Sequence, residues 1–143
     1  MIMPGSIGVS PEGRGLPTQL SLFDEKQVAG HKRLVDAIHS KGSLVAAQLY
    51  HAGRQASEAI TGLDPLAPSA IPCGILQNHP KEITHEQMDR IKEQFRQAAR
   101  WSIEAGYDIV EVHFDFFKFH SPKALRQAFS SSAAWGMEVW PII

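Results

Sequence analysis

The 143-residue sequence contains one cysteine, Cys73, and no excess of either charge. A single cysteine excludes an intrachain disulfide and does not suffice for a cysteine-based zinc site. The 14 Lys and Arg residues balance 15 Asp and Glu residues, so the sequence provides neither a basic surface for nucleic acid nor a polybasic membrane anchor. It also lacks an apolar run of membrane-spanning length, and its first residues do not resemble a signal peptide. These absences predict a cytoplasmic protein with no nucleic-acid or membrane partner.

The most informative stretch is residues 42–56, in which an apolar segment gives way abruptly to polar side chains. The segment 44–47 is apolar throughout, which is typical of a parallel strand buried on both faces. The polar side chains that follow are Gln48, Tyr50, His51, Arg54 and Gln55. Because active sites of parallel α/β folds lie beyond the carboxyl ends of the strands, these residues mark a candidate site.

Two helices are predicted, at residues 25–41 and 85–105, each bounded by clear capping signals. Each has an Asp or Thr N-cap, a Gln three residues later and a glycine just past its end: Asp24, Gln27 and Gly42 for the first, Thr84, Gln87 and Gly106 for the second. Apolar strands are predicted at residues 2–9 and 107–113. The alternation of strands and helices predicts an α/β fold with a parallel sheet and right-handed crossovers.

Residues 10–20 and 57–82 are predicted to be loops because proline and glycine interrupt them. His51 and Arg54 are expected to organise the loop after the strand as hydrogen-bond donors. The other histidines outside the last strand and the tail are expected at the surface, namely His31, His39, His79 and His85. No histidine pair has both metal-like spacing and a third ligand, so no metal site is predicted.

The last predicted strand carries different side chains on its two faces. Val110 and Val112 share one face and suit packing against helices, whereas Glu111 and His113 share the other. Burying the polar pair without partners would be costly, so we expect this end of the strand to lie at an open mouth of the fold.

Four segments of the sequence resemble the old yellow enzyme family of FMN-dependent NAD(P)H:flavin oxidoreductases and ene-reductases. They are residues 7–14 (IGVSPEGR), 48–54 (QLYHAGR), 65–70 (PLAPSA) and 105–113 (AGYDIVEVH), in the family's order and at similar spacing. Any one of them is weak, but together they are specific, and they cover about residues 1–113. The resemblance implies a (β/α)₈ TIM barrel that binds FMN at its carboxyl-end mouth, with NAD(P)H as reductant and a small molecule as substrate.

The resemblance also assigns roles to three residues. It implies that Gln48 hydrogen-bonds the flavin ring, and that Ser6 stands where a small residue brings the backbone close to the flavin. It implies that His113 is a catalytic residue, the first of two side chains that grip the substrate's carbonyl oxygen. Such a grip polarises an activated alkene for hydride transfer from reduced flavin.

The sequence departs from the family pattern after His113. Phe116 stands at the second gripping position, and Lys118 stands at the usual position of the proton-donating Tyr. We therefore expect a fragment, with a partial barrel of about three parallel strands and two helices over residues 1–113 and a diverged or irregular tail over 114–143. For such a chain we expect weak or absent FMN binding, too little structure for activity of its own, and self-association through unpaired strand edges. Two alternatives stay open: an FMN-dependent ene-reductase, or a non-catalytic remnant that at most binds a partner.

Overall fold

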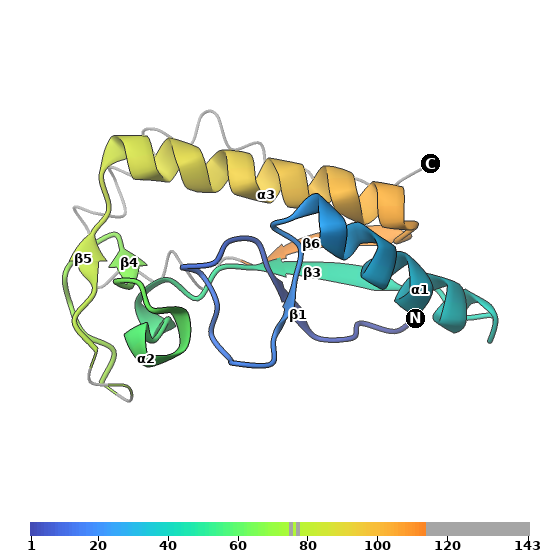
Figure 1. Cartoon of the computed structure of the whole chain (residues 1–143), viewed down its shortest axis with the longest axis horizontal. Coiled ribbons are helices and arrows are strands. Elements are labelled where there is room, and N and C mark those ends of the chain that lie inside the picture. Colours follow the sequence, from blue (N-terminus) through green and yellow to red (C-terminus); the bar gives the residue numbers. More distant parts are fainter. Residues whose placement is uncertain (75, 77, 114–143) are drawn as a thin grey trace.

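The sheet of the computed structural model contains the three predicted strands and one short addition (Figure 1). The structure describes residues 1–74, 76 and 78–113, so the tail expected at residues 114–143 lies outside the described residues. The predicted strands are β1 (Ser6–Gly8), β3 (Ala46–Tyr50) and β6 (Ile109–His113). The addition is β2 (Leu20–Ser21), at the end of the segment predicted to be a loop. All pairings are parallel, in the order β2-β1-β3-β6.

The two long helices begin at the predicted caps. In α3 (His85–Ala105), Thr84 and Gln87 form a reciprocal capping box, and Gly106 ends the helix in the left-handed conformation with φ 90°. The capping box of Asp24 and Gln27 also forms, but it opens a 3₁₀ turn, η1 (Glu25–Gln27), before α1 (Val28–His39). The sequence therefore located both helix starts, although the first turn is tighter than an α-helix.

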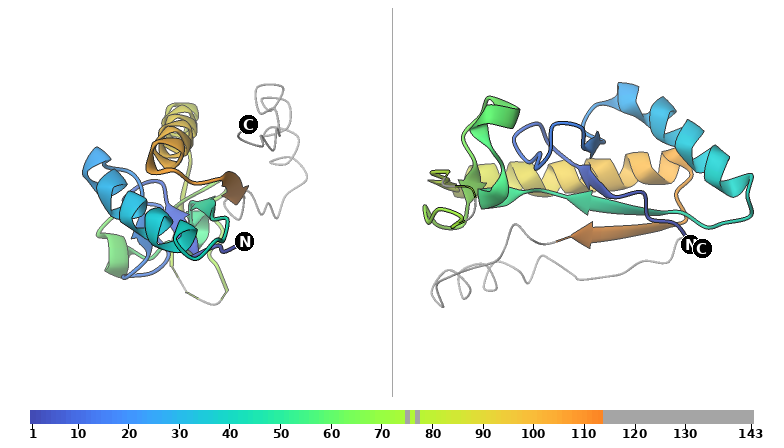
Figure 2. Two further views of the ribbon diagram at one scale, coloured as in Figure 1. Left: turned by 90° about the vertical axis from the view of Figure 1, so that its right-hand side faces the viewer. Right: turned by 90° about the horizontal axis from the view of Figure 1, so that it is seen from below.

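Both long helices pack on one face of the sheet. The buried side chains between the layers include Ile7 and Leu49 from the strands, Val35 from α1, and Ile91 and Phe95 from α3. Seen from below in Figure 2, α3 lies behind β3, and none of the described helices covers the sheet face toward the viewer. Strands β1, β3 and β6 therefore have one apolar face on the helices and one face available for a site.

The segment predicted as a long loop, residues 57–82, contains regular structure. It holds α2 (Glu58–Thr61) and a two-stranded parallel sheet of β4 (Leu66–Ala67) and β5 (Lys81–Glu82), and the short helix η2 (Gly53–Gln55) precedes it. The loop prediction was wrong here because two-residue strands carry no detectable periodicity. Within the described part of the chain, no helix combines the length and apolarity needed to cross the lipid bilayer.

His31 is buried, which corrects its predicted surface position. Only 5% of it is exposed, because α1 presents it to β2 and to Tyr107 rather than to water. Its Nε2–H donates to the Ser21 carbonyl oxygen at 3.0 Å, and its Nδ1 accepts from the Tyr107 hydroxyl at 2.8 Å. Burial lowers the pKa of His31, against the raising effect of the Ser21 carbonyl, and raises the pKa of Tyr107 to about 12. The neutral pair thus ties α1 to the sheet.

Candidate functional site

The predicted site residues lie on neighbouring strands, on the face away from the helices. In the strand register Ser6 stands beside Gln48, and Gln48 beside Glu111. Two residues further along, at the carboxyl end of the sheet, Tyr50 stands beside His113. Because register partners in parallel strands point to the same side, these residues form one surface, which we call the strand-end face. The fold therefore brings Ser6, Gln48 and His113, which are far apart in the sequence, onto a common surface.

Gln48 and His113 share a carboxylate neighbour. Gln48 Nε2 lies 3.2 Å from Glu111 Oε1 and 3.3 Å from Glu111 Oε2, so it donates to the carboxylate. His113 Nδ1 lies 3.5 Å from the same Oε1 atom. The Glu111 and His113 side chains are 40% and 37% exposed, which agrees with the open position expected for them from the sequence. The alternation of β6 predicted the placement of Glu111, but not its contact with Gln48.

The Ser6 hydroxyl is held from the chain that follows β1. Gln19 Nε2 donates to Ser6 Oγ at 2.9 Å, and Gln19 Oε1 accepts from the Gly15 backbone N–H at 2.8 Å. Gln19 therefore bridges the turn at Gly15 to the strand-end face. Sequence analysis missed Gln19, because nothing in its neighbourhood distinguishes it from an ordinary polar loop residue.

Two rings, those of Tyr50 and His113, border the strand-end face at its carboxyl end. The rings of Tyr50 and His113 lie 5.8 Å apart between centroids, with an interplanar angle of 36°. A Cβ atom added at Gly15 would lie 3.4 Å from the Tyr50 hydroxyl oxygen, so the chain after β1 passes close to Tyr50. The two rings therefore lie two residues beyond Gln48 and Glu111 in the strand register, at the carboxyl end of the face.

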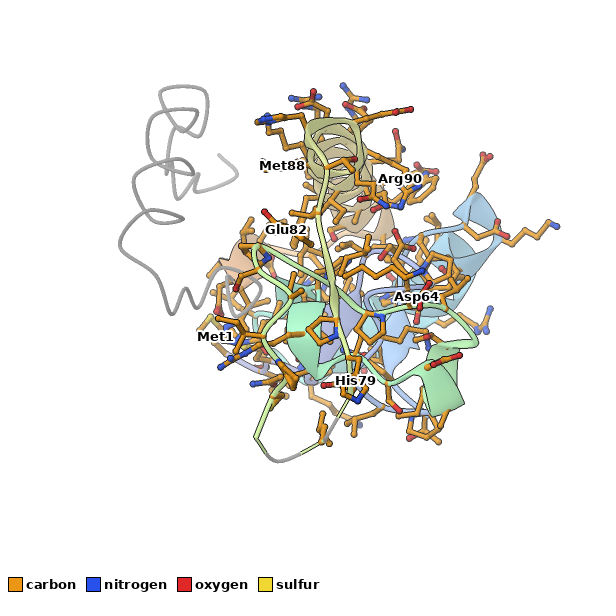
Figure 3. All side chains as sticks on the ribbon, turned by 90° about the vertical axis from the view of Figure 1, so that its left-hand side faces the viewer. Met1, Asp64, His79, Glu82, Met88 and Arg90 are labelled. Atoms are coloured by element: carbon orange, nitrogen blue, oxygen red, sulfur yellow. The ribbon has the colours of Figure 1, made fainter. Side chains whose placement is uncertain are left out.

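A polar cluster in which Glu12 and His51 are buried lies at the loops that follow β1 and β3. Figure 3 views this end of the molecule, with Arg90 on α3 above the sheet. Arg90 donates to Glu12 Oε1 at 3.2 Å, and Gln94 Nε2 lies 3.4 Å from the same atom. His51 is fully buried, and its Nδ1 accepts from the Gly53 backbone N–H at 3.0 Å. His51 therefore organises its loop as predicted, but in this bond as an acceptor rather than as a donor.

The hydrogen-bond donor role predicted for the Arg54 side chain in the same loop stays a prediction. The Arg54 backbone carbonyl accepts from Asn78 Nδ2 at 2.6 Å, which ties the loop after β3 to the segment before β5.

A surface cavity of about 270 Å³ lies on the helix side of the sheet, between α3 and the residues after β1, and is lined by Val9, Phe23 and Trp101 among others. It is separate from the strand-end face.

The cluster predicts a loss of stability in acid. Burial lowers the pKa of His51 from 6.5 to about 4; the Glu12 charge acts in the raising direction and the Arg90 charge in the lowering direction. Because the folded pKa is depressed, the contribution is complete above pH 6.5 and is lost as the pH falls from 6.5 to 4. The free energy of unfolding should be about 2 kcal/mol lower at pH 5 than at pH 7.5 from this group alone, and His31 adds to the loss.

Urea unfolding at the two pH values measures this effect. His51→Gln should flatten the pH dependence, whereas His85→Gln, which replaces an exposed histidine at the start of α3, should leave it unchanged. Equal pH dependence in wild type and His51→Gln would show that His51 is not the titrating group.

The parallel strands and the helices packed on them define an α/β class of fold, and comparisons with known proteins identify the family. A model described as the NADH:flavin oxidoreductase / NADH oxidase family matches residues 1–115. The chain therefore belongs to this family of FMN-dependent enzymes, in which NADH or NADPH is the reductant. The predicted resemblance to old yellow enzymes and the predicted partial TIM-barrel fold are confirmed.

Two curated relatives show the extent of the match. The chain is 38% identical to an NADH oxidase of Thermoanaerobacter brockii over 122 residues, which cover 82% of the chain and 19% of the relative. It is 36% identical to an NADPH dehydrogenase of Bacillus velezensis over 113 residues, which cover 79% of the chain and 32% of the relative. The chain thus spans less than a third of these relatives.

Solved structures of related enzymes also superpose on most of this chain and only part of their own length. Morphinone reductase superposes with a TM-score of 0.72 at 31% identity, over 78% of the chain and 34% of that structure. An old yellow enzyme homologue from Zymomonas mobilis superposes with a TM-score of 0.70 at 28% identity and the same coverage. A further morphinone reductase structure is a complex with tetrahydroNAD, at a TM-score of 0.71.

The donor set of the strand-end face fits a flavin ring. Gln48 Oε1 offers an acceptor, because Nε2 is engaged by Glu111, and Ser6 offers a hydroxyl donor, which together complement a ring edge where an N–H group adjoins a carbonyl group. Phe116 and Lys118, the two departures from the family pattern, lie outside the described residues. Among the residues that are described, no three His, Cys, Asp or Glu side chains are grouped so that they could hold a metal ion.

Proposed function

We propose that the chain acts as an FMN-dependent oxidoreductase that passes hydride from NAD(P)H, through the flavin, to an activated alkene. The observation that carries the proposal is the strand-end face, where Ser6, Gln48 and His113 come together from β1, β3 and β6. Family membership supports the cofactor and the reductant. The barrel portion in this proposal is residues 1–113, and a cytoplasmic location stays a prediction from the sequence.

Each residue has a distinct role in the proposal. Gln48 holds the edge of the flavin ring through its amide, and Ser6 brings the backbone of β1 close to the ring. His113 donates a hydrogen bond to the substrate's carbonyl oxygen, which draws electron density from the conjugated alkene. Bound FMN would supply the hydride chemistry. The open side of Glu111 and His113 leaves room for a small substrate beside Gln48.

A second candidate function, a non-catalytic remnant, is favoured by one observation. In the described part of the chain the sheet has four strands, and the outer edges of β2 and β6 have no partner strand. A closed barrel has no such edges. An incomplete sheet would leave one side of a bound flavin in water and weaken its binding.

Turnover distinguishes the two candidates. Purified protein with millimolar FMN is mixed with NADPH or NADH and 2-cyclohexenone, and cofactor oxidation is followed by absorbance. The first candidate predicts alkene-dependent oxidation above a blank of free FMN. Oxidation equal to the blank, with either nicotinamide cofactor, would favour the remnant and contradict the enzyme.

Self-association is a further expectation for this chain. Unpaired parallel strands are templates for pairing with another chain, so light scattering after size exclusion should show oligomers rather than a monomer. A lysine on an edge strand opposes such pairing, so Val112→Lys on β6 should shift the protein toward monomer. Ile103→Lys, at an exposed position on α3, serves as the matched control. A sharp monomer in the wild type, with one cooperative thermal transition, would contradict this expectation.

A further inference from the structure

The contact between Gln48 and Glu111 fixes the orientation of a side-chain amide. The two ends of a glutamine amide have nearly the same shape but opposite hydrogen-bonding character. Both oxygens of Glu111 lie within 3.3 Å of one end of Gln48. An ionised carboxylate only accepts hydrogen bonds, so the end facing it must be the NH₂ group. Glu111 therefore sets which end of Gln48 points toward β6.

This orientation determines what the strand-end face presents to a ligand. With Nε2 held by Glu111, Gln48 Oε1 points away from the carboxylate as an acceptor. The neighbouring Ser6 Oγ already accepts from Gln19 Nε2, so the Ser6 hydroxyl proton is directed elsewhere and can be donated. One acceptor and one hydroxyl donor side by side match a ligand edge in which a ring N–H adjoins a carbonyl group.

The same carboxylate also adjoins the predicted catalytic residue. Glu111 Oε1 lies 3.5 Å from His113 Nδ1, within ion-pair range, and His113 also contacts the Tyr50 ring. One oxygen atom of Glu111 thus stands between the predicted cofactor contact and the predicted substrate contact. A movement of Glu111 would disturb both.

We propose that Glu111 is a positioning residue: it holds the Gln48 amide with its oxygen toward the ligand, so that the face selects a flavin ring through its N–H group, and it keeps His113 beside that amide. The proposal rests on the proposed function for the identity of the ligand. The orientation of the Gln48 amide by Glu111 involves only side chains of this chain, so it can be tested without flavin.

The first measurement uses the ligand-free protein. Side-chain amide signals of Gln48 in ¹H–¹⁵N spectra should include one proton shifted downfield and slowed in exchange by the carboxylate. In Glu111→Gln this signature should disappear, because a neutral amide partner accepts more weakly and permits both orientations of Gln48. Glu104→Gln, on the exposed surface of α3, is the matched control and should leave Gln48 unchanged.

Backbone signals of Ile7 and Leu49 report whether the variant keeps the fold. If Glu111→Gln does not fold, Glu111→Asp retains the carboxylate at a shorter reach and should weaken the signature without abolishing it. Identical Gln48 signals in the wild type and in the folded Glu111 variant would overturn the proposal.

The second measurement tests ligand selection with riboflavin and 3-methylriboflavin, in which a methyl group replaces the ring N–H. Wild type should prefer riboflavin by about tenfold, the usual cost of leaving one buried acceptor unpaired. Glu111→Gln should reduce this preference to less than about threefold. Equal binding of both flavins by the wild type would overturn the selection. Binding of neither would contradict the proposed function, while the Gln48 spectra would still decide whether Glu111 positions the amide.

Discussion

Replacing His113 by alanine should lower the rate of NAD(P)H-dependent reduction of 2-cyclohexenone by about 10²–10³-fold, the usual effect of removing one preorganised donor to a developing oxyanion. His113 closes the carboxyl end of the strand-end face, 37% exposed and beside Glu111 and Tyr50. In the proposed function, the His113 ring donates a hydrogen bond to the substrate's carbonyl oxygen. The loss should fall on kcat more than on KM, because the bond strengthens as charge develops on the oxygen.

Two variants make this measurement specific. His113→Asn keeps an N–H donor and should recover part of the rate, whereas His85→Ala removes an exposed histidine at the start of α3 and should keep all of it. Circular dichroism checks that each variant is folded. A folded His113→Ala protein that reduces the alkene as fast as the wild type would remove His113 from the mechanism.

Replacing Gly13 by alanine should destabilise the fold by about 3 kcal/mol, at the upper end of typical overpacking effects. A Cβ atom at this position would lie 2.5 Å from His51 Cδ2 and 2.8 Å from Ser10 Oγ. The His51 ring is fully buried and cannot move into solvent. Gly13 is itself fixed on both sides, by its N–H to Ser10 Oγ at 3.0 Å and by its carbonyl to the Ala52 N–H at 2.8 Å.

Thermal unfolding measures the effect of Gly13→Ala as a fall in Tm on the order of 10 °C. Gly74→Ala, where an added Cβ atom meets nothing within 4 Å, should change the Tm by little. In a His51→Ala background the clash with the imidazole ring is absent and only the close contact with Ser10 Oγ remains, so Gly13→Ala should cost less than in the wild type. An equal cost in both backgrounds would show that His51 is not the obstacle.

Sequence signals predicted where the helices begin because helix capping depends on residues that are close together in the sequence. The capping boxes at Asp24 and Thr84 depend on residues three positions apart, and both form. Hydrophobicity is a weaker guide to the buried face of α3: the apolar Ile103 is 53% exposed, whereas the polar Ser102 is buried. Ser102 lies four residues after Ala98, on the same face, and its hydroxyl donates to the Ala98 carbonyl at 2.9 Å. Helical spacing from Ala98 marks the right face, whereas hydrophobicity alone would select Ile103 for burial instead of Ser102.

The parts of the site that the sequence did not reveal depend on contacts between distant segments. Alternation along β6 placed Glu111 and His113 on one face, but the partner of Glu111 is 63 residues away on β3. Gln19 lies 13 residues from Ser6, in the irregular chain between β1 and β2, where no periodicity exists. The surface prediction for His31 was wrong for a similar reason, since one of its two partners, Ser21, lies on β2 and the other, Tyr107, lies between α3 and β6.

The central claim is that the strand-end face binds the flavin ring, and chemical-shift mapping with FMN tests it most directly. ¹H–¹⁵N spectra of the wild type are recorded as FMN is added to millimolar concentration, with Gln48→Leu and Gln97→Leu, a position on α3, as the test and control variants. If the flavin ring binds there, saturable shifts should centre on Ser6, Gln48 and His113, and Gln97→Leu should retain these shifts whereas Gln48→Leu should lose them. Shifts confined to other surfaces, or shifts that persist unchanged in Gln48→Leu, would contradict it.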